Sequence, residues 1–336
     1  MKHFKTTDKR ALVPSLAALL SLPLAALLGI LLGATKIGVG DLLSLLSGKT
    51  DTPTAQILLF VRIPRVLASL ACGAALSVSG AVLQRVLSNR LASPSIVGVN
   101  AGAGLAVTIC AACGILGGWR LSLFSFLGAA TAVLLVGLGA KKWGVSAGTV
   151  ILMGVALNSL LGAFSDSIVT LVPEAATISS DFRVGSFAAV NYQTLLPATV
   201  LILLTMFLLL SLTNELDVLT LGDENARGLG LNATSVRILF LLLAALLAGA
   251  SVCVCGQLSF VGLLIPYAVR RLSKGTTRRY LCLCALFGAS FVSLCDSLSR
   301  FLFAPYEISV GILTAFLGAP CFIVILVGTK GGHDNA

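Results

Sequence analysis

The sequence predicts an all-α membrane protein of about ten transmembrane helices, arranged as inverted five-helix repeats with both termini in the cytoplasm. Of its 336 residues, 57% are hydrophobic and only 11% are charged, and its mean hydropathy is +1.03. Apolar runs long enough for a helix to cross about 30 Å of hydrocarbon recur along the whole chain. No sizeable soluble domain fits between them, so we expect a single transmembrane domain over residues 1–336.

Ten apolar spans are expected in order along the chain. The first follows a basic segment but has no convincing small-residue cleavage site, so we expect a retained helix rather than a signal peptide. The eighth contains Pro266 and is too short to cross alone. The expected spans are 11–33, 57–83, 95–116, 121–140, 148–172, 192–213, 235–255, 258–269, 281–303 and 308–328.

The net charge of +10 follows membrane topology rather than nucleic-acid binding, because the basic residues lie at span ends without interleaved exposed aromatics. Positively charged loops stay in the cytoplasm. Ten crossings with the N-terminus inside put about two thirds of the lysines and arginines inside, whereas nine would divide them almost evenly. The deciding cluster is Arg270, Arg271, Lys274, Arg278 and Arg279. Residues 1–10 and 329–336 are then cytoplasmic tails, and 214–234 is a cytoplasmic loop.

Two similar segments within the chain predict the inverted repeat. "GAALSVSG" (73–80) and "GASVCVCG" (249–256) share Gly-Ala, a Val and a closing Gly in register. They fall in the second and seventh spans, which cross in opposite directions. Glycine-interrupted helices in such repeats surround a central pathway in many transporters. Small residues also permit close helix packing, and the sequence does not separate these two uses.

The residues that carry chemistry are few. All nine cysteines lie within or beside apolar spans, where a thiol acts as a small hydrophobe, and the only histidines, His3 and His333, are terminal. No H-E-x-x-H or G-x-S-x-G motif is present. The carboxylates Asp166, Asp296 and Glu307 map to the outer ends of spans, whereas ion-coupled transport favours a midplane carboxylate. We therefore expect no catalytic residue, no metal site and no directly bound cofactor.

The polar loop "NELDVLTLGDENARGLGLN" (214–232) predicts a short helix. Asp223 and Glu224 open it and Arg227 follows, an order that suits the helix dipole, with an end near Gly228 or Gly230. Such a helix can dock on a cytoplasmic partner or rest on the membrane surface, and the residues themselves favour neither use.

Several segments together resemble the FecCD family, the permease subunits of ABC importers for iron-siderophore complexes, haem and cobalamin. The likeness runs through nearly the whole chain. Its carriers are "RIPRVLASLACGAALSVSGAVLQ" (62–84), "NRLASPSIVGVNAGAG" (89–104), "ILMGVALNSL" (151–160), "FRVGSF" (182–187), "LGDENARGLGLN" (221–232), "GQLSFVGLLIP" (256–266), "DSLSR" (296–300) and "EISVGILTAFLGAP" (307–320). The chain departs from the family where N-P-L-A is common, at Asn89 and Arg90, and where P-H is common, at Pro266 and Tyr267.

The resemblance implies a set of partners in a bacterial cytoplasmic membrane, surrounded by lipid. These are two cytoplasmic ATPase subunits that carry ATP and Mg²⁺, an extracytoplasmic substrate-binding protein, and a second permease copy, either identical or a paralogue. It implies no catalysis by the permease itself. An iron-siderophore complex is the expected ligand class, with haem and cobalamin behind.

The resemblance also implies roles for particular residues. Arg62 and Arg65 of the "RxPR" segment, together with Arg300, match arginines that pair with glutamates of the binding protein. The turn "KKWGVSAG" (141–148) matches the region of the cytoplasmic gate. The residues that match the ATPase-coupling helix are Leu221, Gly222, Asp223, Glu224, Ala226, Arg227, Gly228 and Gly230.

Two alternatives follow from the residues alone. The first is an ion-coupled secondary transporter that acts without an ATPase, and the second is a membrane-embedded enzyme. For the arginines, the simpler interpretation is that Pro64 starts a helix while Arg62 and Arg65 lie at the water interface.

Overall fold

The computed structural model describes residues 9–33, 52–143, 147–272, 275–302 and 304–330, with isolated positions at 38, 40, 41, 45 and 47. Within these residues the regular structure is entirely helical. The elements are α1 (Lys9–Leu31), α3 (Pro53–Ile57), the π-helix η1 (Leu58–Arg62), α4 (Ile63–Val86), α5 (Val99–Ala112), α6 (Gly118–Trp143), α7 (Ala147–Leu171), α8 (Ala175–Val184), α9 (Tyr192–Ser211), α10 (Thr213–Thr220), α11 (Asp223–Gly228), α12 (Ala233–Cys255), α13 (Val261–Leu272), α14 (Thr277–Phe301) and α15 (Val310–Lys330).

All ten expected spans coincide with helices, which confirms the predicted fold class. Among the described residues, seven segments are long and apolar enough to cross a membrane: α1, the continuous segment from α3 to α4, α6, α7, α9, α12 and α14. The third, eighth and tenth expected spans are α5, α13 and α15. At 1.5 Å per residue, the 12 residues of α13 reach only about 18 Å, so this helix is too short to cross alone, as its sequence predicts.

Hydrophobic run length did not predict α8 or α10. Both are short and alternate apolar with polar residues, so neither contains a long apolar run. The predicted loop helix is present as α11. Gly222 and Gly230 flank it with φ of +96° and +82°, a backbone region that favours glycine, and the N–H of Leu231 closes its end by donating to the Ala226 carbonyl at 2.9 Å.

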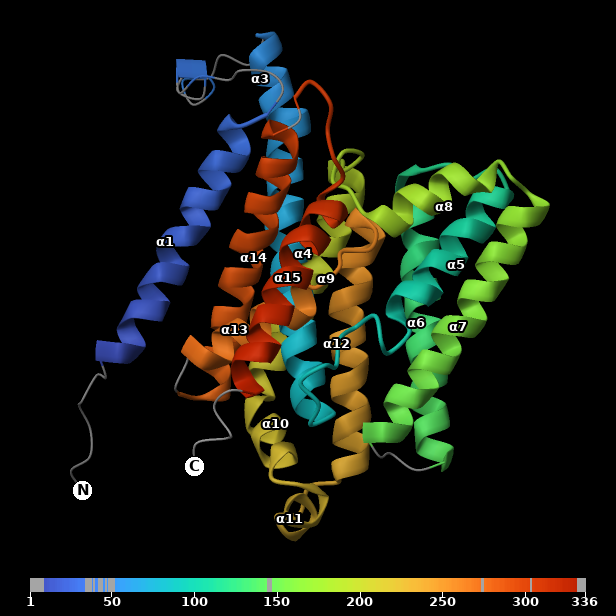
Figure 1. The fold of residues 1–336 in the computed structure, drawn as a ribbon, viewed down its shortest axis with the longest axis vertical. Coiled ribbons are helices and arrows are strands. Elements are labelled where there is room, and N and C mark those ends of the chain that lie inside the picture. The colour runs from blue at the N-terminus through green and yellow to red at the C-terminus, as the bar shows by residue number, and fades with distance from the viewer. Residues whose placement is uncertain are drawn as a thin grey trace.

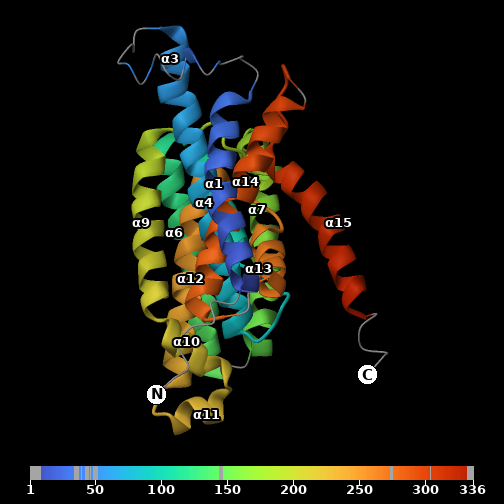
Figure 2. The ribbon, with the colours of Figure 1, turned by 90° about the vertical axis from the view of Figure 1, so that its left-hand side faces the viewer.

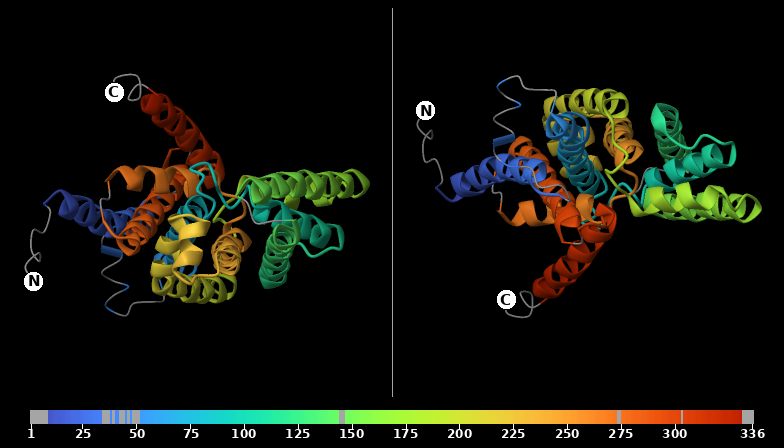
Figure 3. Two further views of the ribbon diagram at one scale, coloured as in Figure 1. Left: turned by 90° about the horizontal axis from the view of Figure 1, so that it is seen from below. Right: turned by 90° about the horizontal axis from the view of Figure 1, so that it is seen from above.

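Most of the helices fall into two groups that meet at α12 (Figures 1 and 3). In the first, α14, α12, α13 and α1 surround α4; in the second, α5, α6, α7 and α8 lie together on one side. Helix α15 leans away from the rest of the bundle (Figure 2). Helix α11 projects at one end, where α1 also begins and α15 ends (Figure 1). We call that end inner and the opposite one outer.

Small residues in α4 serve close helix packing. A Cβ built on Gly73 would lie 2.3 Å from the Gly288 carbonyl oxygen of α14, and one on Gly80 would lie 1.7 Å from the Gly262 carbonyl oxygen of α13. The backbones therefore touch at these glycines. The two similar segments, 73–80 and 249–256, lie in α4 and at the end of α12, which are antiparallel neighbours. The Ser79 hydroxyl of α4 donates to the Ala244 carbonyl of α12 at 2.6 Å.

Parts of three predictions lie outside the described residues. These are residues 1–8 and 331–336 of the two tails, residues 144–146 of the turn between α6 and α7, and Lys274 of the basic cluster.

Candidate functional site at the outer end of the bundle

The outer start of α4 differs from the prediction that Pro64 begins a helix. The chain is already helical from Pro53, and Pro64 follows the single π-turn η1. Proline has no N–H and its ring displaces the carbonyl four residues earlier, so the α-helical ladder cannot continue past it unchanged. The Ile63 N–H therefore reaches back five residues to the Leu58 carbonyl. The Leu59 carbonyl is left for a donor outside the helix, and the Tyr192 hydroxyl of α9 donates to it at 2.7 Å.

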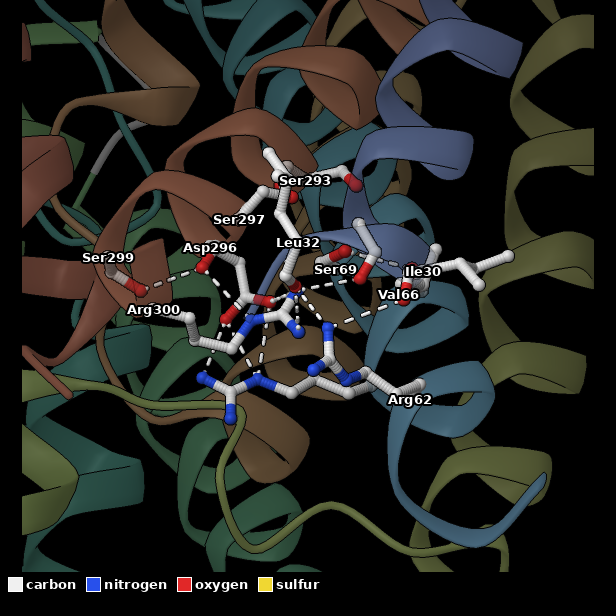
Figure 4. A network of polar contacts seen from close by, with 12 residues as sticks. Ile30, Leu32, Arg62, Val66, Ser69, Ser293, Asp296, Ser297, Ser299 and Arg300 are labelled. Atoms are coloured by element: carbon white, nitrogen blue, oxygen red, sulfur yellow. Dashed lines mark hydrogen bonds and ion pairs between the residues drawn. The ribbon is translucent and has the colours of Figure 1, made fainter. Parts of the chain in front are cut away.

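This local geometry holds two arginines one turn apart, close to a third from α14. Arg62, Arg65 and Arg300 are only 4%, 7% and 2% exposed. Thus the structure brings the three predicted arginines together, but it buries them rather than presenting them to solvent. With Asp296 and Glu307 they form a cluster that we call the outer junction. Figure 4 shows the part of it around Asp296, Arg62 and Arg300.

Asp296 is the centre of the outer junction. Its carboxylate is 1% exposed and lies 3.0 Å from Nη2 of Arg65 and 3.0 Å from Nη2 of Arg300. Nε of Arg65 also donates to both carboxylate oxygens, at 3.0 and 3.2 Å. A buried charge is tolerated when it is paired and hydrogen-bonded, and the Asp296 carboxylate forms ion pairs with two buried guanidinium groups at once.

Arg62 and Arg300 also hold the end of α1. The last carbonyls of a helix have no partner within the helix and carry the negative end of its dipole, so cations bind there well. Arg300 donates to the Gly29 carbonyl at 3.0 Å and to the Leu32 carbonyl at 3.2 Å. Arg62 donates to the Ile30 carbonyl at 3.3 Å and also to that of Leu32. A Cβ on Gly33 would lie 2.4 Å from Nη2 of Arg62, so glycine leaves room for this contact.

Glu307 is the most accessible member of the outer junction. Its carboxylate lies 2.8 Å from Nη1 of Arg65, and its side chain is 38% exposed. It precedes α15 and lines a cavity of about 470 Å³ formed mainly by α6, α8, α12 and the loop between α8 and α9, whose lining includes Asp181 and Ser309. Among the residues that the structure describes, three guanidinium groups face two carboxylates, which gives this part of the junction a net positive charge, and one of the two carboxylates is reachable from outside.

The sequence pointed to the arginines without their partners. The sequence indicates Asp296 and Glu307 only as possible carboxylates for ion coupling, whereas in the structure both bind Arg65. One signal was available, because Asp296 and Arg300 are four residues apart and share a helix face. Asp166, the third carboxylate considered, forms an exposed pair with Arg183 of α8 at 2.6 Å.

The residues matched to ATPase coupling lie together at the inner end, as α11 and its flanks. Ala226 is fully buried against the bundle, whereas Leu221 and Leu229 are 57% and 65% exposed. Glu224, Arg227, Gly228 and Gly230 are exposed as well, and Gly222 and Asp223 begin the helix. The helix therefore presents both apolar and charged groups beyond the end of the bundle (Figures 1 and 2).

A bundle with seven helices long and apolar enough to cross a membrane, among the residues described, is the architecture of a multi-pass membrane protein. The sequence model of the FecCD transport family matches residues 20–328. This chain belongs to the FecCD transport family.

Relatives of known role match along almost their full length. The Fe(3+)-citrate import system permease protein YfmD of Bacillus subtilis is 35% identical over 298 residues, which cover 89% of each chain. The hemin transport system permease protein HmuU of Yersinia pestis is 34% identical over 306 residues, covering 88% of this chain and 91% of HmuU. A solved inward-facing structure, described as a metal-chelate type ABC transporter, has a TM-score of 0.83 and 30% identity, and covers 93% of this chain and 98% of its own.

Proposed function

We propose that this protein is the membrane-spanning permease subunit of an ABC importer that carries an iron-siderophore or related metal chelate across the bacterial cytoplasmic membrane. The observation that carries the proposal is the near full-length likeness to permeases for ferric citrate and hemin. The permease provides the pathway and does no chemistry, and ATP with Mg²⁺ is handled by separate ATPase subunits.

The proposed ATPase contact is the segment from Leu221 to Gly230. Its support is geometric, because α11 stands beyond the inner end of the bundle with Leu221, Leu229 and Arg227 exposed. A short helix that is anchored by one buried alanine and exposes apolar groups suits a cleft on a partner protein. Helix movement on nucleotide binding would then change which side of the membrane the pathway faces.

The proposed docking site for the substrate-binding protein is the outer junction, with Arg65 as the contact rather than all three arginines. Arg62 and Arg300 are committed to the end of α1, whereas Arg65 holds Glu307 at the edge of solvent. A carboxylate of the binding protein would exchange with Glu307 on Arg65. The net positive charge of the junction favours such an arrival, and charge-assisted pairs fix orientation and association rate more than affinity.

A second permease copy completes the proposed importer. Helices α7 and α15 expose more apolar surface than α4, α12 or α14, and α15 leans away from the bundle. Lipid or a second copy can cover such faces. Whether the second copy is identical or a paralogue is decided by the mass and composition of the purified complex.

Capture of the permease by its binding protein tests the docking proposal. Replacing both Arg62 and Arg65 by Glu should abolish capture by an immobilised binding protein, because it removes the attraction for incoming carboxylates. Both side chains are buried, so the folded fraction is measured in parallel by size-exclusion chromatography. Unchanged capture by folded double variant would contradict docking at the outer junction.

A further inference from the structure

A second polar cluster joins three helices at the inner end of the bundle. Arg85 lies in the last turn of α4, Asp217 in α10, and Thr277 and Tyr280 in the first turn of α14. We call these four residues the inner junction. Nη1 of Arg85 lies 3.0 Å from Oδ1 of Asp217, and the Thr277 hydroxyl bonds both groups. Asp217 therefore links α10 to both α4 and α14.

One aromatic contact helps to orient Arg85. Its guanidinium carbon lies 5.0 Å from the ring centroid of Tyr280, a distance typical of a cation–π contact. The Tyr280 hydroxyl in turn donates to the Pro266 carbonyl of α13 at 3.1 Å. Tyr280 and Thr277 are 4% and 3% exposed, whereas the side chain of Asp217 is 51% exposed. The junction thus has a fixed side on α4 and α14 and a more open side on α10.

Helix α10 lies between the projecting helix and the rest of the bundle. The main neighbours of α11 are α10 and α12, while α10 also contacts α4, α9 and α14. Leu216 and Leu219 are buried and form the apolar face of α10. Such hydrophobic contacts hold the helix against the bundle but are not directional. Among the described side chains of α10, Asp217 supplies the ion pair to α4. The directional contact by which a displacement of α11 can reach α4 and α14 through α10 is thus this ion pair, while α12, which touches α11 and packs against α4, offers a second route.

Helices α4 and α14 are suited to carry that displacement across the membrane as one body. They pack backbone to backbone at Gly73 and Gly288, where interlocked packing resists relative sliding. At their outer ends, the same two helices carry Arg65 and Asp296 of the outer junction. Both polar junctions are thus attached to one rigid pair of helices.

We infer that Asp217 is a positioning residue for transport, which transmits movement of α11 to the α4–α14 pair and so to the outer junction. The inference rests on the proposed contact between α11 and an ATPase. Because coupling between two sites is reciprocal, docking at the outer end would bias the inner end through the same contacts.

The test measures whether nucleotide moves the outer end in the complex with the ATPase subunits. Spin-labelled unnatural amino acids replace Gln56 on α3 and Ser180 on α8, both exposed at the outer end. Pulsed electron paramagnetic resonance then measures the distance between the two spin labels, with and without ATP and vanadate. We expect a clear change in the otherwise native chain and loss of most of it in Asp217→Asn, which removes the charge and keeps the shape. Asp217→Glu, which keeps a carboxylate, should restore part of it.

Glu215→Gln is the matched control. It makes the same carboxylate-to-amide change on the same helix, two residues from Asp217, and no described ion pair links Glu215 to α4 or α14. It should keep the full distance change. Two further readouts detect a merely structural defect: the amount of ATPase that co-purifies with the permease, and its melting temperature. Such a defect would lower both values in Asp217→Asn. A full distance change in Asp217→Asn would overturn the inference, whereas no change in the otherwise native chain would overturn the proposed ATPase coupling itself.

Discussion

The two ends of the α4–α14 pair are held by polar junctions of opposite character. At the outer end, Arg62, Arg65, Asp296 and Arg300 are all less than a tenth exposed and bind one another and the end of α1. At the inner end, Asp217 is half exposed and holds Arg85 from a short helix. Removing one member of a buried charge cluster leaves an uncompensated buried charge, whereas exposed pairs contribute little to stability. We therefore expect the buried members of the outer junction to contribute far more to stability than the half-exposed Asp217 of the inner junction.

Asp296→Ala is the variant that breaks this comparison most strongly. It removes the carboxylate that pairs with both Arg65 and Arg300 in the buried junction, so the free energy of unfolding should fall by about 3–5 kcal/mol. Thermal unfolding of the purified protein in detergent measures the loss. Asp217→Ala at the inner junction is the paired variant, and an equal loss in both would remove the distinction between the two ends.

Gly80→Ala tests the close backbone packing of α4 against α13, beside the α4–α14 pair that joins the two junctions. The new Cβ would lie 1.7 Å from the Gly262 carbonyl oxygen, so α4 and α13 must separate, at a cost of about 1–3 kcal/mol. Gly137→Ala in α6 is the control, because nothing lies within 4 Å of its Cβ position and alanine favours helices. A melting temperature that falls equally in both variants would argue against close backbone packing at Gly80.

Glu307→Gln sharpens the comparison within the outer junction itself. Its partly exposed pair with Arg65 is expected to contribute about 0–1 kcal/mol to stability, far less than Asp296. The variant also removes the charged partner of Nη1 of Arg65, while Asp296 still binds the rest of its guanidinium, and it adds one net positive charge. Capture by the binding protein should therefore become faster and more sensitive to salt. Surface plasmon resonance at two ionic strengths measures this. Slower capture would mean that Glu307 does not compete for Arg65.

Asp166→Ala is expected to have the smallest effect. Asp166 and Arg183 are 67% and 48% exposed, so loss of their ion pair should change the free energy of unfolding by no more than about 0.5 kcal/mol. The same unfolding assay applies. A loss near that of Asp296→Ala would show that exposure does not separate structural from weak ion pairs in this protein.

Features that depend on local pattern could be predicted from the sequence. Each of the ten apolar runs is a helix, and the glycines and charges around 222–230 predicted α11 and its limits. Helices α8 and α10 are short and amphipathic, so run length could not find them. The environment of Arg65 depends on α14 and the segment before α15, which are more than 200 residues away in the chain. Burial of the arginines is therefore a property of the fold and not of the "RxPR" segment.

ATP-driven uptake tests the central claim most directly. The permease is reconstituted in liposomes with its ATPase subunits and binding protein, and ferric citrate, a ferric siderophore and hemin are offered separately. We predict uptake of one of these chelates that requires ATP, and loss of that uptake when residues 221–230 are replaced by a flexible glycine-serine linker. Uptake by the permease alone, driven by an ion gradient without ATP, would contradict the account and favour a secondary transporter.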